Sequence, residues 1–293
     1  MHSHLSTIIG RRSTARRRAG EGDVTETAVP HPVRTAGGDT PWGRGPGRLG
    51  GAPTGTAVWR LRSRGCWDDA AALLDALARS EPPAALLRAE LLVERCMFTS
   101  EGWGQAEEAL RAAESLSLDD EERGAAACER GYLAYAATLL RVRDRADEAR
   151  AALGRAAALL APDSPGRPLL DFRRGLMAQH IGGNPQAAEA AYRRAHNAAL
   201  AGGDALLGSY TWRHLAALAL DAGEVSEARH GFAESLRMRE ETGFLIGIAP
   251  ALVALADAMT EPEAGRLMAE AGRLYRLLGG VPRWLADRLP GTP

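Results

Sequence analysis

Hydrophobic and polar positions along most of the chain follow the period of an α-helix. Ala228, Phe232 and Leu236 recur every four residues, which places them on one face of a helix. Gly223 separates this helix from an apolar helical segment before it. The segment 179–204 has the same order of helix, glycine turn and helix. The pattern therefore predicts a series of helical hairpins and no convincing β-strand.

One small residue recurs at the same place in each predicted hairpin, after a turn and ahead of larger apolar residues. These residues are Ala70, Ala106, Ala149, Ala188, Ala228 and Ala264. Successive members lie 36, 43, 39, 40 and 36 residues apart, which leaves room for two helices and two short loops. Because antiparallel helices approach closely only where a side chain is small, we expect these alanines at helix crossings.

Glycine and proline mark the ends of the predicted helices. The glycines expected to adopt positive φ in turns are Gly65, Gly102, Gly183 and Gly223. Pro185 suits the first turn of a helix. Pro250 lies inside a predicted helix, so it must kink that helix or start it one turn late. The segment 281–289 is predicted to close the series, with Trp284, Leu285 and Leu289 covering the last apolar face.

The hairpins resemble tetratricopeptide repeats (TPRs). In the best-matching unit, 209–242, the matching residues are Trp212, Leu215, Ala216, Ala219, Gly223, Ala228 and Phe232. In another unit, Gly175 stands where the family has leucine. The longer spacings resemble those of TPR variants in the sensor and effector regions of large bacterial transcription regulators. Over roughly residues 57–278, the resemblance implies an all-α solenoid of five to six antiparallel hairpins whose first helices line a concave groove.

Composition divides the chain into two parts. Residues 1–55 are rich in glycine and proline, and they carry eight arginines against four acidic residues. Such a segment buries too little apolar surface to offset chain entropy, so a disordered basic tail is predicted. A tail of this kind can touch nucleic acid or another anionic surface. Residues 56–293 are predicted to form the repeat domain, for which we expect no direct nucleic-acid binding and no membrane insertion.

Residue types also exclude several kinds of catalysis. All 36 basic residues are arginine, so the chain has no lysine for a P-loop, a Schiff base or a kinase cleft. No motif typical of a hydrolase or metalloprotease is found. His180 and His214 fall on first helices, whereas His196 and His230 fall on second helices, so these four side chains are not expected to converge on a metal ion. We therefore expect no enzyme activity and no cofactor.

Cysteine usage indicates the compartment. Cys66, Cys96 and Cys128 have no CxxC spacing, and their number and spread do not suggest a disulfide framework. Neither a secretory signal nor a membrane span is evident in the sequence. These observations predict a cytoplasmic protein.

The register of the first helices identifies candidate groove residues. They are Arg141, Arg173, Met177, His180, Tyr210 and Arg213. Because guanidinium groups bind carboxylates through paired hydrogen bonds, Arg173 and Arg213 are expected to form one basic site. The alternative is that these arginines only solvate the helix or pair with neighbouring acids.

Two functions follow from the repeat pattern. The first is a scaffold or adaptor that binds a protein or peptide segment in the groove, through an acidic group or a C-terminal carboxylate. The second is the sensor or effector region of a transcription regulator that lacks its own DNA-binding domain and responds to a partner or a small molecule.

Overall fold

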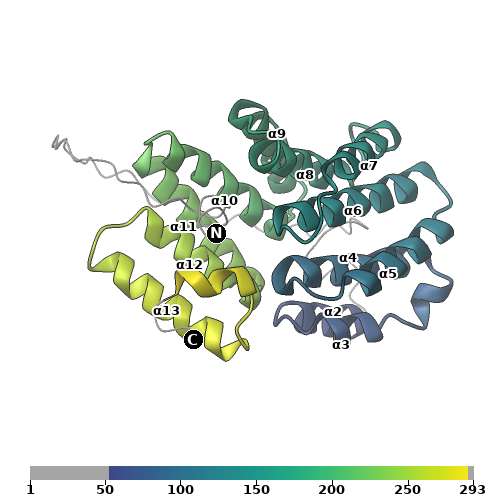
Figure 1. The fold of residues 1–293 in the computed structure, drawn as a ribbon, viewed down its shortest axis with the longest axis horizontal. Helices are drawn as coiled ribbons and strands as arrows, with labels where there is room; N and C mark the ends of the chain where they lie inside the picture. Colours follow the sequence, from purple (N-terminus) through teal and green to yellow (C-terminus); the bar gives the residue numbers. More distant parts are fainter. Residues whose placement is uncertain (1–52, 290–293) are drawn as a thin grey trace.

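The computed structural model describes residues 53–289, and this part of the chain contains helices and no strand (Figure 1). The α-helices are α2 (Pro53–Arg62), α3 (Trp67–Ala72), α4 (Pro82–Thr99), α5 (Trp103–Leu116), α6 (Asp120–Leu139), α7 (Ala146–Leu159), α8 (Arg167–His180), α9 (Pro185–Ala201), α10 (Ala205–Asp221), α11 (Val225–Thr242), α12 (Ile248–Asp257) and α13 (Glu263–Leu277). Three 3₁₀ helices, η1 (Leu77–Arg79), η2 (Leu245–Gly247) and η3 (Arg283–Arg288), complete the set. The predicted all-α class is confirmed.

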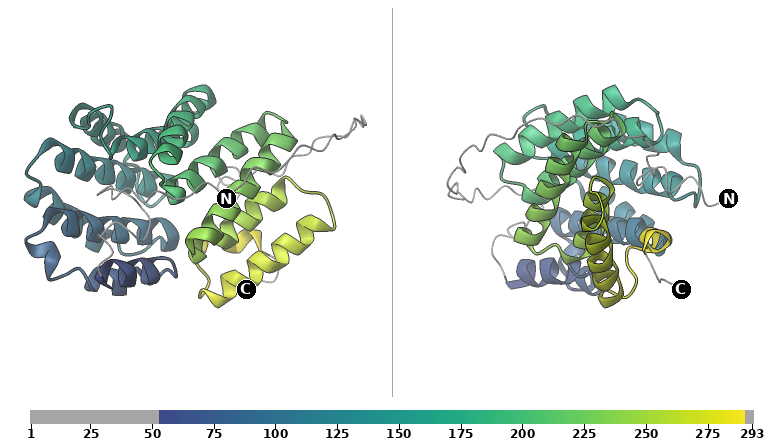
Figure 2. Two further views of the ribbon diagram at one scale, coloured as in Figure 1. Left: turned by 180° about the vertical axis from the view of Figure 1, so that it is seen from behind. Right: turned by 90° about the vertical axis from the view of Figure 1, so that its left-hand side faces the viewer.

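The helices pack in adjacent pairs. The pairs are α2 with α3, α4 with α5, α6 with α7, α8 with α9, α10 with α11, and α12 with α13. Neighbouring pairs touch where the second helix of one pair meets the first helix of the next, as α9 with α10 and α11 with α12, and also through first helices, as α4 with α6. The inner cavity is lined mainly by α4, α6, α8 and α10. Figures 1 and 2 show the pairs following one another along an arc that bends back on itself. The first helices therefore face the inside of the arc.

The predicted disordered tail lies outside the described residues, apart from its last three positions. Helix α2 already begins at Pro53, so the helical part starts slightly earlier than the predicted boundary at residue 56.

The small residues predicted at helix crossings are buried in five of the six hairpins. Ala70, Ala106, Ala149, Ala188 and Ala228 each have 0 % of their surface exposed. In the last pair, Ala264 is only half-buried, and Ala271 of the same helix is fully buried instead. The alanine periodicity therefore marks the contact between the two helices of a pair, except where the series ends.

Turn residues behave as their chemistry predicts. The four glycines expected in turns all have positive φ, between +60° for Gly183 and +84° for Gly223. Pro185 is the first residue of α9, and the preceding Asn184 caps that helix by accepting a hydrogen bond from the Ala187 N–H. Pro250 lies in the first turn of α12, after η2, so the helix starts late rather than kinking.

Gly175 has a packing explanation. A Cβ atom at this position of α8 would overlap the ring of Tyr192 on α9. Tyr192 is fully buried between the two helices. The departure from the leucine of the TPR pattern is therefore compensated by the bulk of the facing tyrosine.

The first helix pair meets the segment between the fifth and sixth pairs, so the expected open concave face is closed. The Ile246 N–H donates a 2.8 Å hydrogen bond to the Ser63 carbonyl at the end of α2. Val58 and Trp59 of α2 share a buried cluster with Phe244 and Ile246. Burial of these apolar side chains stabilises the closed arc, because an open arc would leave them in water.

The last described segment, η3, also contacts the first half of the arc. Leu285 of η3 and the following Leu289 are buried against α12 and α13, and Trp284 packs against the same cluster, as predicted for a closing segment. Trp284 also lines the inside of the arc. Arg283 forms a 2.6 Å salt bridge with Glu101, and η3 contacts α4. The end of the described chain thus lies against the first half of the arc.

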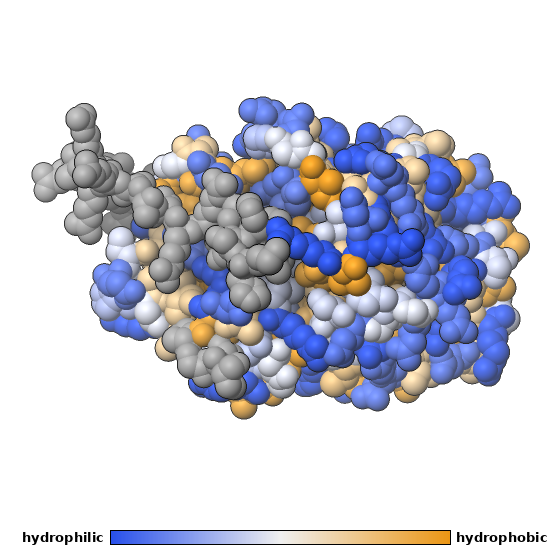
Figure 3. Space-filling view, in the orientation of Figure 1, coloured by the Kyte–Doolittle hydropathy of each residue, from blue (hydrophilic) through white to orange (hydrophobic). Residues whose placement is uncertain are grey.

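The face shown in Figure 3 is mainly hydrophilic, with apolar residues in separate small patches. None of the described helices combines the length and hydropathy needed to cross a bilayer.

Candidate functional site

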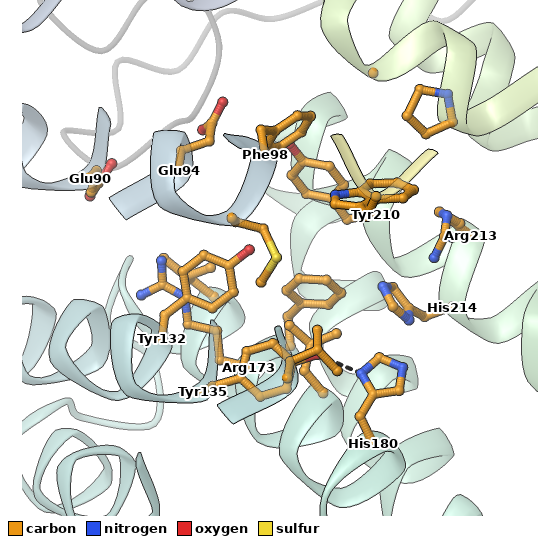
Figure 4. Close-up of a pocket in the computed structure, with 18 of the residues that line it drawn as sticks. Glu90, Glu94, Phe98, Tyr132, Tyr135, Arg173, His180, Tyr210, Arg213 and His214 are labelled. Carbon is orange, nitrogen blue, oxygen red and sulfur yellow. Dashed lines mark hydrogen bonds between the residues drawn. The ribbon is translucent and has the colours of Figure 1, made fainter. Parts of the chain in front are cut away.

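A cavity of about 150 Å³ lies inside the arc (Figure 4). Its wall contains side chains from α4, α6, α8 and α10, and it is completed by residues of α2, α11, η2, α12 and η3. Residues far apart in sequence, such as Arg62 and Trp284, therefore line the same space. We refer to this cavity as the central pocket.

Aromatic side chains form much of the wall. Six of them are Phe98, Tyr132, Tyr135, Phe172, Tyr210 and Trp284. The rings of Phe172 and Tyr210 stack with their centroids 5.9 Å apart, and those of Tyr132 and Tyr135 stack at the same distance. Stacked rings, within α6 and between α8 and α10, hold each other in place, so much of the pocket wall is a preformed apolar surface.

Two buried ion pairs lie in this wall. Arg62 donates to Glu94 at 2.5 and 2.9 Å, and Arg173 donates to Glu129 at 2.5 Å. The Arg173 guanidinium also lies over the Tyr132 ring, with 4.6 Å between its carbon and the ring centroid. Each carboxylate therefore balances one guanidinium that would be costly to bury alone.

Arg213 of α10 is different, because no hydrogen bond or ion pair holds its guanidinium among residues 53–289. An acid that acts on it electrostatically, Asp257, is itself held by Arg288 at 2.5 and 3.1 Å. Burial lowers the pKa of Arg213. An arginine still stays protonated at neutral pH, so Arg213 brings to the central pocket a positive charge that no acid of residues 53–289 contacts.

Arg239 adds a second positive charge. It donates to the Gly247 carbonyl at 2.7 Å and to the Ser209 hydroxyl at 3.3 Å, and it lies over the Tyr210 ring. Burial, together with Arg213, lowers its pKa to about 10. Arg239 therefore ties α11 to η2 through neutral partners, and no acid of the described residues forms an ion pair with it.

His180 and His214 lie side by side, with ring centroids 5.6 Å apart (Figure 4). His180 Nδ1 is 2.5 Å from the Tyr135 hydroxyl, and His214 Nδ1 is 3.2 Å from Gln179 Oε1. Burial, followed by the charge of Arg213, lowers the pKa of His180 to about 4 and that of His214 well below its ordinary value. Both rings are therefore neutral at neutral pH.

The two histidines do not form part of a larger ligand set. His196 and His230 lie elsewhere, on either side of the Trp212 ring. Within the described part of the chain, no group of three or more histidine, cysteine or acidic side chains is placed to hold a metal ion.

The structure brings together four of the six candidate groove residues. Arg173, His180, Tyr210 and Arg213 line the central pocket. The remaining two do not: Met177 packs in the core between helices, and Arg141 is exposed at the end of α6 with φ +57°. Because Arg173 is held by Glu129, the expected pair of free arginines is reduced to Arg213 alone.

Several pocket residues were not among the candidates. Tyr132 and Tyr135 follow Glu129 at three-residue intervals on α6, and this spacing is a signal that the sequence does contain. Trp284 and Arg239 carry no such signal. They reach the pocket only because the arc closes.

No protein-family model matches the chain, and no curated protein is significantly similar to it.

Proposed function

We propose that the chain is a binding module whose binding site is the central pocket. One observation carries this proposal: side chains from α4, α6, α8 and α10, and from the segments that close the arc, line a single cavity. A ligand in this cavity contacts most of the repeats at once. Its binding therefore favours the closed arc over any more open arrangement.

This geometry supports the sensor-type function over an extended peptide groove. Because α2, η2 and η3 all contribute to the pocket, a bound ligand changes the equilibrium between arrangements of these segments. A partner that binds the outer surface of the same segments then binds one arrangement more tightly than another. The nucleic-acid-binding part of such a regulator belongs, in this proposal, to a different polypeptide or domain.

A protein- or peptide-binding scaffold is the second candidate, and Arg213 supports it. A guanidinium without a counter-ion suits a C-terminal carboxylate. The pocket then takes the last residue of the partner rather than an extended stretch of it.

The proposal is for binding and not for catalysis. A general base works best when its pKa lies near the operating pH, whereas the pKa of His180 is about 4. Glu94 and Glu129 are occupied by arginines. These features suit a fixed recognition surface better than a proton-transfer site.

We place the module in the cytoplasm as part of the same proposal. None of Cys66, Cys96 and Cys128 forms a disulfide within the described residues. Burial raises the pKa of Cys96 to about 12, so this thiol is unreactive. Cysteines without disulfides suit a reducing compartment.

Filling the pocket tests the proposal. Met97 lines it from α4, so Met97→Trp puts a larger side chain into the cavity. A library of ring-sized fragments is screened by ligand-observed NMR against wild type and this variant. We expect fragments that bind wild type and lose binding to Met97→Trp, whose fold is checked by circular dichroism.

Leu118→Trp is the matched control, because Leu118 is 77 % exposed and lies outside the pocket. It should bind the same fragments as wild type. If no fragment binds wild type, or if Met97→Trp binds them equally well, the central pocket is not the binding site.

A further inference from the structure

We infer that the central pocket takes a monoanionic carboxylate with an apolar body of about one ring, and that Arg213 holds the carboxylate. This inference rests on the proposed function, because it names the class of ligand for the same pocket. It is carried by the charge balance of the wall, by the position of Arg213 and by the size of the cavity.

The charges of the described wall favour an anion. Arg62 and Arg173 are each paired with a glutamate, and the two histidines of the pocket are neutral. Arg213 and Arg239 have no acidic hydrogen-bond partner among residues 53–289. A singly charged carboxylate compensates the charge of Arg213, whereas a dianion costs more to remove from water.

Arg213 is the group placed to receive that anion. Among residues 53–289 its guanidinium has no hydrogen-bond partner, whereas Arg239 already donates to a backbone carbonyl. Figure 4 shows Arg213, His214 and His180 along one side of the pocket, with Tyr210 and Phe98 at another side. A planar guanidinium forms two parallel hydrogen bonds with a carboxylate, so a carboxylate is the ligand group that uses its donors best.

His180 offers a further donor beside Arg213. A phenol is a good donor, so we assign the Tyr135 hydroxyl as donor to His180 Nδ1, which leaves the ring proton on Nε2. The neutral imidazole can then donate this proton to an anion without adding charge. The same polar side of the pocket thus combines one full charge with one neutral donor.

The apolar part of the pocket wall determines which apolar body of the ligand fits. Met97, Leu176 and the aromatic rings offer apolar contact and no free charge. An apolar cavity of about 150 Å³ accommodates a molecule of roughly the size of benzene. A flat ring stacks well against Tyr210 or Phe172, so an aromatic acid fits better than a branched aliphatic acid.

Three probes of nearly equal shape test the charge. Benzoate is negative, benzamide is neutral and benzamidine is positive. Titration calorimetry of wild-type protein at low ionic strength should show that affinity falls from benzoate to benzamide to benzamidine. We expect benzoate to bind at least tenfold more tightly than benzamide. Equal binding of benzoate and benzamide overturns the inference while leaving the pocket as a binding site. Failure of all three probes contradicts the proposed function as well.

Arg213→Gln tests the residue. This substitution should lower the affinity for benzoate at least tenfold and leave the affinity for benzamide nearly unchanged. Arg237→Gln is the control, because Arg237 is half exposed on α11 and pairs with Glu234 and Glu241. Equal losses in both variants would mean non-specific electrostatics and would overturn the assignment. The comparison of the three probes on wild type stands even if Arg213→Gln fails to fold.

A small carboxylic acid and the C-terminus of a peptide both present a carboxylate, and two further probes distinguish these two kinds of ligand. One is 3-phenylpropionate, and the other is the peptide Gly-Gly-Ala-Phe with a free C-terminus. Tighter binding of the peptide identifies a chain end as the source, and tighter binding of the free acid identifies a small molecule. In either case the C-terminal amide of the peptide should not bind, and its binding as tightly as the free peptide overturns the role of the carboxylate.

Discussion

The ring of Phe244 stacks on that of Trp59, with 6.1 Å between centroids and 30° between planes. Phe244 follows α11 and is fully buried, and Trp59 belongs to α2 near the start of the described chain. This contact joins the first helix pair directly to the segment between the fifth and sixth pairs. The pocket is therefore enclosed by long-range packing rather than by any one hairpin.

Removing this ring should open the arc. Phe244→Ala leaves a cavity in the closing cluster and should lower the free energy of unfolding by about 3–5 kcal/mol. The radius of gyration from small-angle X-ray scattering should increase, because the two ends lose their main apolar contact. Chemical denaturation measures the stability in the same samples.

Phe232→Ala is the control for that variant. Phe232 is 3 % exposed and packs between α10, α11 and α12, away from the closing cluster. The Phe232→Ala variant should lose a similar free energy of unfolding, with little change in its radius of gyration. An unchanged radius in Phe244→Ala would show that other contacts suffice to close the arc.

Ala228 should not tolerate a larger side chain. It is fully buried on α11, in a cluster with Ala216 and Ala219 of α10. Ala228→Leu forces these helices apart and should cost roughly 2–4 kcal/mol, measured by urea unfolding. Ala264→Leu, at the matching but half-buried position of α13, should cost clearly less. Equal effects would argue against a close crossing at Ala228.

The Glu129–Arg173 pair should be essential for stability. Glu129 is 1 % exposed and Arg173 4 %, so Glu129→Gln leaves a buried guanidinium without its counter-charge. We expect a loss of about 3–5 kcal/mol in the free energy of unfolding. Glu189→Gln breaks an exposed pair with Arg193 and should cost less than about 1 kcal/mol. A small effect at Glu129 would mean that water reaches Arg173.

Acid should destabilise the domain through His180. Its pKa is about 4 when folded, below the ordinary value near 6.5, so the unfolded chain binds the proton first. Stability due to the neutral ring is present above about pH 6.5 and is lost as the pH falls toward 4. Denaturant unfolding at a series of pH values should show a shallower decline for His180→Asn than for wild type.

His230→Asn is the control, because His230 is exposed on α11. Its stability should fall with pH as steeply as that of wild type. A wild-type slope in His180→Asn would mean that carboxylates alone cause the acid response.

Much of the local structure was determined by the sequence itself. Period-four apolar positions and the recurring alanines identify the hairpins, because each helix must bury one face against its partner. Gly183 and Gly223 mark turns that need positive φ, and Pro185 marks a helix start. These are local requirements, so residues close in sequence express them fully.

The pocket was decided only by the tertiary structure. Helical register places Arg213 on an inner face, but it does not say that Glu129 pairs with Arg173 while no acid within 53–289 pairs with Arg213. Nor does it bring Trp284 to the same cavity. These outcomes depend on the curvature accumulated over all the helix pairs and on the burial of Phe244 against α2. Such long-range contacts have no periodic signature, because the residues that form them lie far apart in the sequence.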